Sequence, residues 1–275
     1  MSILDGKKTA AARKERLAAY LRELKEKGEE RRLAVLAVGE DAPSAMYART
    51  VQRAALSVGM PVEICRYAED ISEEALIQAV AALGERKDIA GILPMLPLPE
   101  RFNRERVLDR IAPEKDVDGQ TAADKGLLFS GSPCFAACTA RAVIAVLEDY
   151  NITLEGKHVV IIGRSDVVGK PLAHLCLTCN ATVTVCHSRT KNLPALTAQA
   201  DILVAAVGKA AFVTPDMVKE GAVIIDVGIN RADGRTVGDV SDAANAKASQ
   251  YTPVPGGIGA VVSTIILENT AYGRR

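Results

Sequence analysis

Short apolar runs alternate with longer amphipathic stretches along this chain, and the alternation predicts an α/β fold. Residues 33–38 read LAVLAV and residues 159–162 read VVII, and each run is bounded by polar residues or glycine. Continuous apolar runs of this length are typical of strands that are buried on both faces of a parallel sheet. The same pattern predicts further strands at residues 62–67, 89–93, 182–186, 202–207 and 223–227.

The stretches between these runs have apolar positions at helical spacing. Residues 9–27 combine Ala and Leu with Arg, Glu and Lys in this rhythm and end before Gly28, which predicts an amphipathic helix. Ser72 stands before Glu73 and Glu74, which predicts a helix N-cap followed by acids in the favourable first turn. Further helices are predicted at residues 44–58, 103–111, 139–150 and 259–270.

This alternation occurs twice, so the fold class that we expect is α/β with two lobes joined by long helices. The expected N-terminal, substrate-side lobe spans residues 1–138 and is completed by a C-terminal helix at residues 256–275. The second lobe, at residues 139–255, would be a Rossmann-type nucleotide-binding domain. Small ligands bind in clefts between lobes, so we expect a small-molecule site there.

Composition and charge exclude several classes of protein. Lys+Arg and Asp+Glu both number 34, so the formal net charge is zero, whereas a general nucleic-acid or membrane-surface binder needs a basic excess. No apolar run approaches the roughly 18 residues of a membrane span, and the first residues lack the apolar centre of a signal peptide. The six cysteines are scattered through apolar segments, as in reducing compartments. We therefore expect a cytoplasmic protein without nucleic-acid, membrane or metal partners.

Residues 163–169, GRSDVVG, connect the predicted strand at 159–162 to a helix that would begin near Pro171. This arrangement can hold a dinucleotide pyrophosphate, because N–H groups at the helix start point at the ligand and glycine lets it approach. The loop departs from G-x-G-x-x-G, because a serine replaces the second glycine and the last glycine comes one residue late. On pattern alone, an ordinary strand-to-helix turn is an equal alternative. The predicted cofactor contacts in the loop are Gly163, Arg164, Ser165, Val168 and Gly169.

The end of the next predicted strand distinguishes NADP from NAD. An acid there binds the ribose 2′-hydroxyl of NAD, whereas basic and hydroxyl groups accept the 2′-phosphate of NADP. Here the strand runs into His187-Ser188-Arg189-Thr190, with no acid. A polar loop that is basic for unrelated reasons is the alternative. We favour NADP as the cofactor, with Ser188 and Arg189 among its contacts.

Longer motifs occur in order along the chain. The first half contains ILDGK (3–7), PSAMY (43–47), LPLP (96–99) and PEKDVDG (113–119), and the second contains GRSDVVGKP (163–171), CHSRT (186–190), GAVIIDVGIN (221–230) and TPVPGGIG (252–259). Together they resemble the bifunctional methylenetetrahydrofolate dehydrogenase/cyclohydrolase family of the FolD type, over essentially the whole chain. The resemblance implies a cytoplasmic homodimer that acts in one-carbon metabolism and purine biosynthesis. Its NADP-dependent reaction would oxidise 5,10-methylenetetrahydrofolate to the methenyl form, which is then hydrolysed to the formyl form.

The same resemblance implies roles for individual residues. Tyr47 and Asp118 would be catalytic and would bind the folate substrate, and Ile229 would contact the cofactor. Pro255, Gly256 and Gly257 would also contact the substrate.

Among the departures from the family pattern on the folate side, two replace polar groups. The family has a lysine four residues after the tyrosine and a glutamine before LPLP, whereas this chain has Val51 and Met95. Hydride loss from a methylene flanked by two amines needs positioning rather than a protein base, but hydrolysis needs a proton carrier. We therefore expect a dehydrogenase whose cyclohydrolase step is weak or lost.

Two alternatives remain open from the sequence. Arg49, Arg53 or Lys125 could replace the lysine from a neighbouring position, although arginine is a poor base. The protein could also be a non-catalytic paralogue that binds folate or NADP and acts as a sensor or dimer partner.

Overall fold

The computed structural model describes residues 1–232 and 234–274, which form two compact units. Unit 1 comprises Met1–Ala11 and Thr139–Val262, and unit 2 comprises Ala12–Cys138 and Ser263–Arg275. The division falls within helix α1 (Gly6–Glu26), at the first residue of α6 (Cys138–Asp149) and within α10 (Ile258–Tyr272). The first residues, which we expected in the N-terminal lobe, group with unit 1 because β1 (Ser2–Ile3) pairs with β11 (Gln250–Tyr251).

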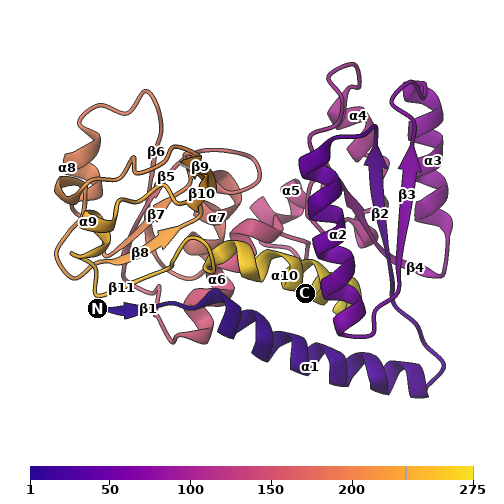
Figure 1. Ribbon diagram of the computed structural model, residues 1–275, viewed down its shortest axis with the longest axis horizontal. Coiled ribbons are helices and arrows are strands. Elements are labelled where there is room, and N and C mark those ends of the chain that lie inside the picture. Colours follow the sequence, from indigo (N-terminus) through magenta and orange to yellow (C-terminus); the bar gives the residue numbers. More distant parts are fainter. Residues whose placement is uncertain (233, 275) are drawn as a thin grey trace. The chain divides into compact units, whose positions relative to one another are not determined.

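Unit 1 is built on a parallel six-stranded sheet with the order β1-β11-β8-β7-β5-β6. Its other strands are β5 (His158–Ile162), β6 (Thr182–Cys186), β7 (Ile202–Ala205) and β8 (Val223–Asp226), and each described pairing in this sheet is parallel. The first of these strands, β5, lies between β6 and β7 (Figure 1). The chain therefore reverses its direction of winding at β5, and such switch points place ligands at the carboxyl ends of the strands.

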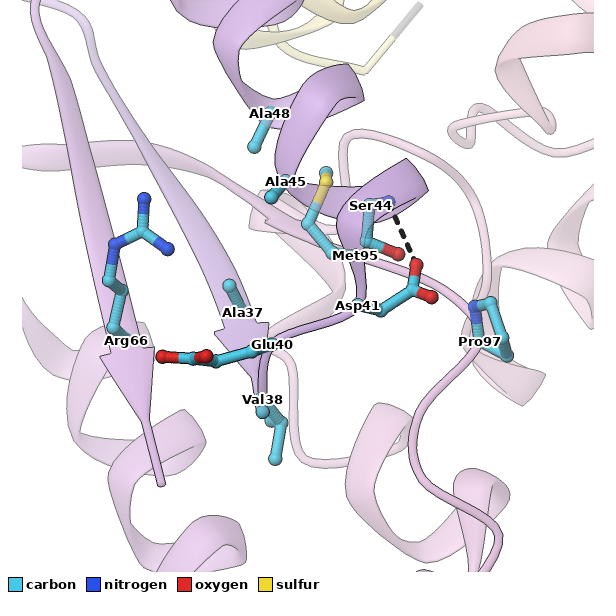
Figure 2. Close-up of a pocket in the computed structure, with 11 residues that line it drawn as sticks. Ala37, Val38, Glu40, Asp41, Ser44, Ala45, Ala48, Arg66, Met95 and Pro97 are labelled. Carbon is cyan, nitrogen blue, oxygen red and sulfur yellow. Dashed lines mark hydrogen bonds between the residues drawn. The ribbon is translucent and has the colours of Figure 1, made fainter. Parts of the chain in front are cut away.

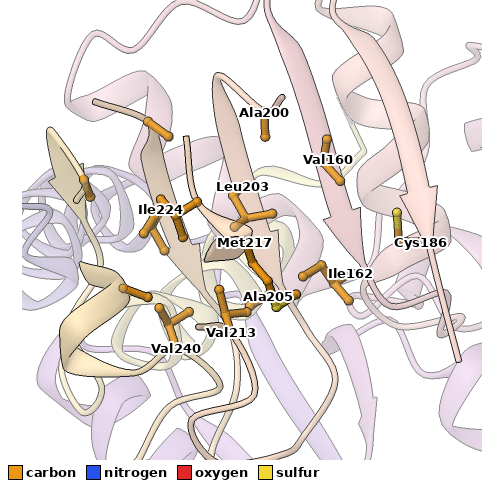
Figure 3. Packing of buried hydrophobic residues seen from close by; sticks show 14 residues of the cluster. Val160, Ile162, Cys186, Ala200, Leu203, Ala205, Val213, Met217, Ile224 and Val240 are labelled. Atoms are coloured by element: carbon orange, nitrogen blue, oxygen red, sulfur yellow. The ribbon is translucent and has the colours of Figure 1, made fainter. Parts of the chain in front are cut away.

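One face of this sheet is covered by a closely packed apolar cluster (Figure 3). Ile162, Leu203 and Ile224 come from neighbouring strands, and Met217 from the short helix η2 (Pro215–Met217) packs against them. Burying each such side chain contributes about 1.5–3 kcal/mol. The apolar runs in the sequence are thus explained by burial in a parallel sheet.

Unit 2 contains a smaller parallel sheet with the order β3-β2-β4. The strands are β2 (Arg32–Val38), β3 (Val62–Tyr67) and β4 (Ile89–Pro94), and they are connected by α2 (Ala42–Ser57) and α3 (Glu73–Glu85). Figure 1 shows the two helices on opposite sides of the strands, as right-handed crossovers in opposite directions require. Ser72 caps α3 by accepting a hydrogen bond from Ala75 N–H at 3.2 Å, which confirms the predicted N-cap.

Two predicted helices have other bounds in the structure: α4 (Arg104–Leu108) is shorter than predicted, and α7 (Gly169–Thr178) begins before Pro171. Several short elements had no individual counterpart in the predicted pattern: η1 (Pro113–Lys115), α5 (Ala122–Phe129), α8 (Leu193–Thr197), α9 (Asp242–Asn245) and the antiparallel pair β9 (Asn230–Ala232) and β10 (Arg235–Val237). Elements of three to eight residues carry too few positions for a periodic signal. Within the described residues, no helix has both the length and the apolar character needed to cross a membrane.

Candidate functional site

The glycine loop after β5 is held by close contacts between backbone segments. Gly163 has a φ of 130°, and a Cβ atom there would lie 2.3 Å from the carbonyl oxygen of Ala206. A Cβ atom on Gly169 would lie 2.1 Å from the carbonyl oxygen of Gly163. Both distances are far below van der Waals contact, so each position accepts only glycine without a shift of the backbone.

The loop leads directly into the start of α7. The Ser165 hydroxyl accepts a hydrogen bond from Val168 N–H at 3.2 Å, which closes the turn. Val168 is the N-cap of α7 and makes no side-chain capping bond. A helix start without a side-chain cap is suited to binding an anion through its N–H groups.

A pocket of about 490 Å³ lies at the carboxyl ends of β5, β6 and β7. The positively charged side chains that line it are Arg164 and Lys209, and no Asp or Glu is among the lining residues. Its lining residues are Ile162, Gly163, Arg164, Ser165, His187, Ser188, Thr190, Leu193, Ala206, Val207, Lys209 and Phe212. This combination of two cations, hydroxyl groups and a glycine loop fits a phosphorylated dinucleotide.

Arg189 differs from its neighbours in this segment. Its side chain is exposed and is not among the residues that line the pocket, and its N–H donates to Nδ1 of His187 at 3.2 Å. The role of Arg189 as a phosphate contact therefore stays a prediction. Lys209 was not among the cofactor contacts predicted from the sequence, although it directly follows Gly208 in the turn after β7.

Two buried carboxylates shape the turns beside this pocket. Asp239 accepts hydrogen bonds from the N–H groups of Val207, Gly208 and Lys209 at 2.6, 3.0 and 2.9 Å. Asp226, at the end of β8, accepts from Val240 N–H at 2.9 Å, and burial raises its pKa to about 6. The carboxylates thus fix the loop that presents Lys209 to the pocket.

The remaining predicted residues of unit 1 lie in two loops. Ile229 follows β8 and is 70% exposed. Pro255, Gly256 and Gly257 precede α10, and a Cβ atom on Gly6 would lie 2.0 Å from the carbonyl oxygen of Gly257. This loop therefore packs tightly against the start of α1, and its contact with a substrate stays a prediction.

Tyr47 and Asp118 lie near each other in unit 2. Tyr47 is on α2 and is 37% exposed, and Asp118 is in the loop after η1. Desolvation of the hydroxyl end of the side chain, and then the nearby Asp118 charge, hold the pKa of the Tyr47 hydroxyl well above its ordinary value. Tyr47 is therefore a neutral hydrogen-bond donor across the physiological pH range.

The Asp118 carboxylate has a partner on each oxygen. Cys138 N–H donates to Oδ1 at 3.3 Å, and Gln120 Nε2 donates to Oδ2 at 3.0 Å. Burial raises the pKa of Asp118 to about 6, although the hydrogen bonds from Cys138 and Gln120 oppose that rise. The carboxyl group therefore changes its charge close to physiological pH.

The two positions that depart from the family pattern are buried and apolar. Val51 is 0% exposed and lies one turn beyond Tyr47 on α2. Met95 is 4% exposed, and Figure 2 shows it beside Ala45 and Ala48. These side chains leave no group that transfers a proton at either position.

A pocket of about 220 Å³ adjoins Met95 at the carboxyl end of β2 (Figure 2). Its apolar side includes Ala45, Ala48 and Met95, and its polar side includes Glu40 and Arg66. By contrast, the three basic residues considered as replacements for the lysine, Arg49, Arg53 and Lys125, are at exposed positions of α2 and α5.

Family models match both halves of the chain. The model for the tetrahydrofolate dehydrogenase/cyclohydrolase catalytic domain matches residues 4–118, and the model for the NAD(P)-binding domain of the same family matches residues 137–274. A bifunctional protein FolD from Methanoculleus marisnigri is 48% identical over 98% of this chain and 94% of its own length.

Solved structures of relatives agree with these matches. The bifunctional FolD methylenetetrahydrofolate dehydrogenase/cyclohydrolase from Campylobacter jejuni superposes with a TM-score of 0.97 at 40% identity, covering 99% of this chain and 98% of its own. A Trypanosoma brucei FolD solved with NADP cofactor and inhibitor has a TM-score of 0.92 at 33% identity, covering 98% of this chain and 96% of its own. The expected fold class is confirmed, and the chain belongs to the tetrahydrofolate dehydrogenase/cyclohydrolase family.

Proposed function

We propose that this protein oxidises 5,10-methylenetetrahydrofolate to 5,10-methenyltetrahydrofolate with NADP as the hydride acceptor. The observation that carries this proposal is the acid-free pocket at the glycine loop, with Arg164 and Lys209 in its lining. Membership of the family and the NADP found in a relative's structure support the same cofactor. The relatives are named as enzymes, so a non-catalytic paralogue is not favoured.

The oxidation does not depend on an acid or a base from the protein. The reacting methylene carbon lies between two amine nitrogens, whose lone pairs stabilise the cation that remains when a hydride leaves. NADP, when bound, takes up that hydride as NADPH. The protein has to position the two molecules and exclude competing reactions.

Tyr47 and Asp118 are the groups that we assign to folate binding. An ionised carboxylate accepts hydrogen bonds from two adjacent N–H donors, such as those on a pterin ring. Asp118 has a pKa of about 6, so it is mostly ionised at neutral pH. Tyr47 supplies an aromatic face and a neutral hydroxyl group near that carboxylate.

The hydrolytic step should be weak or absent. Hydrolysis of the methenyl cation requires addition of water and proton transfer, for which a positioned acid or base contributes about 10²–10⁴-fold. The buried Val51 and Met95 offer neither. Although the relatives are bifunctional by name, this chain should release the methenyl product.

A spectrophotometric assay tests the proposed function directly. The purified protein is given methylenetetrahydrofolate with NADP or NAD, and the absorbance bands of NADPH and methenyltetrahydrofolate are followed together. We expect both products to accumulate in equal amounts with NADP. No NADPH formation above the rate without enzyme would refute the dehydrogenase, and rapid loss of the methenyl band would refute the weak hydrolase.

We also propose a homodimer in the cytoplasm, serving one-carbon metabolism and purine biosynthesis. The family resemblance and the exposed edge of the unit 2 sheet support the dimer: β3 is an edge strand, with one row of backbone groups outside the sheet. The balanced charge supports the absence of nucleic-acid and membrane partners. Sedimentation equilibrium at several protein concentrations should give twice the chain mass, and a monomer at all of them would refute the dimer.

A further inference from the structure

Asp118 is connected through Gln120 to an arginine on another element of unit 2. The Arg104 guanidinium, on α4, donates to Gln120 Oε1 at 2.8 Å. At its other end, Gln120 Nε2 donates to Asp118 Oδ2 at 3.0 Å and to the Asp118 carbonyl oxygen at 3.2 Å. The three residues thus form one hydrogen-bonded chain from a cation to a carboxylate.

The chemistry of these groups fixes the orientation of the amide. Arg104 can only donate, and an ionised Asp118 can only accept, so the amide oxygen must face the guanidinium and the amide nitrogen must face the carboxylate. Gln120 is 2% exposed, whereas Arg104 and Asp118 are half-buried. Water therefore cannot readily replace these hydrogen bonds, and the Gln120 side chain is held in one position.

Both oxygens of Asp118 are constrained in this way. Cys138 N–H binds Oδ1 and Gln120 binds Oδ2, and the Cys138 thiol also interacts with the carboxylate. Because each carboxylate oxygen accepts about two hydrogen bonds, the group as a whole keeps acceptor capacity for a ligand. A carboxylate that is already oriented loses less entropy when a two-donor ligand binds.

We propose that Gln120, anchored by Arg104, is a positioning residue that holds the Asp118 carboxylate in the orientation and the ionised state that folate binding requires. This inference rests on the proposed function of the site. The groups that face Asp118 are Tyr47 from α2, the N–H and thiol of Cys138 from α6, and Asp116 from the same loop. Gln120 contributes to ionisation because its donated hydrogen bond favours the charged form of Asp118.

The test compares variants of Gln120 and Arg104. Gln120→Leu keeps the size of the side chain but removes all three of its hydrogen bonds, and Arg104→Met removes only the anchor. For Gln120→Leu we expect the KM for methylenetetrahydrofolate to rise about tenfold, with a smaller rise for Arg104→Met. The Kd for NADP should not change in either variant.

The pH dependence separates positioning from general stability. Without the hydrogen bond from Gln120, the pKa of Asp118 should rise, which ¹³C NMR of the aspartate carboxyl groups can measure. In a profile of kcat/KM against pH, the decline on the acidic side should move to higher pH by the same amount. Gln120→Glu should move both further, because it places a second carboxylate beside the first.

Arg106→Met is the matched control, because Arg106 is also on α4 but pairs with Glu73 at 2.5 Å. Unchanged KM and Asp118 pKa in folded Gln120→Leu and Arg104→Met would overturn the inference, as would equal effects in Arg106→Met. If Gln120→Leu does not fold, the KM and the Asp118 pKa of Arg104→Met decide whether the inference holds. The NMR measurement needs no turnover, so an inactive wild-type protein would refute the proposed function while the Asp118 pKa still tests the positioning.

Discussion

Individual residues in unit 2 determine which chemistry the proposed folate site can perform. Asp118 is the ionisable group, Tyr47 stays neutral beside it, and Val51 and Met95 are apolar. The first two suit binding of a polar ring, while the last two remove the usual means of proton transfer. The side chains at this site therefore suit substrate binding but not hydrolysis.

The ionisation of Asp118 should make substrate binding dependent on pH. Its pKa is raised to about 6, so the acceptor form is lost as the pH falls through that value. We expect the KM for methylenetetrahydrofolate to rise about tenfold for each pH unit below the pKa, because one proton is taken up. Steady-state kinetics from neutral to mildly acidic pH measure this effect. Asp118→Asn should raise KM at neutral pH and abolish the dependence of KM on pH. A KM that is constant over the window would contradict the assignment.

Restoring the two missing polar groups should restore hydrolysis more than dehydrogenation. In Val51→Lys with Met95→Gln, we expect methenyltetrahydrofolate hydrolysis to rise about a hundredfold, because only that step needs the proton carrier. Val51 is fully buried, so the lysine should also lower the free energy of unfolding, by about 1–3 kcal/mol. The control Val51→Met with Met95→Gln adds length without an amine. An equal gain in this control would show that space, rather than proton transfer, limits hydrolysis.

Arg189 offers a test of the cofactor prediction. If its guanidinium binds the 2′-phosphate, Arg189→Ala should weaken NADP binding about tenfold to a hundredfold and leave NAD binding nearly unchanged. Calorimetric titration with both dinucleotides measures the difference, with Lys191→Ala as a neighbouring control. Because Arg189 does not line the pocket, Arg164→Ala and Lys209→Ala belong in the same series. Equal losses for NADP and NAD in all three variants would contradict a 2′-phosphate site.

At the scale of elements, the strand–loop–helix unit from β5 to α7 depends on two glycines. Gly163 and Gly169 allow the loop to pass against the backbone of its neighbours. This strand–loop–helix motif could be predicted from the sequence because glycine, proline and a β-branched run are strong local signals. The segments that it contacts, the turns after β6 and β7, are distant from it in the sequence.

Gly169→Ala should damage both the loop and the cofactor site. The added Cβ would lie 2.1 Å from a carbonyl oxygen, so we expect the free energy of unfolding to fall by about 1–3 kcal/mol and NADP binding to weaken. The matched control is Gly126→Ala in α5, where a Cβ would meet no atom within 4 Å. There alanine should stabilise the helix by up to about 1 kcal/mol. Chemical denaturation of both variants tests the contrast, and equal effects would contradict it.

At the scale of the whole molecule, each unit has its own sheet and its own apolar cluster. The alternating pattern predicted both sheets, and the strands at residues 62–67 and 182–186 have the predicted bounds. The pattern did not predict that the first residues join unit 1. A two-residue strand such as β1 has no periodicity, and only its pairing with β11 defines it.

The sequence by itself determined the α/β class, the glycine loop, the absence of an acid after β6 and the loss of two polar groups near Tyr47. These features are local, or they follow from the order of motifs. Only the tertiary structure decided which groups surround Asp118. Arg104 is 16 residues from Gln120 in the sequence, and Cys138 is 20 residues from Asp118. No spacing rule connects them, because their contacts result from the folding of unit 2, to which α4, Cys138 and the loop after η1 all belong.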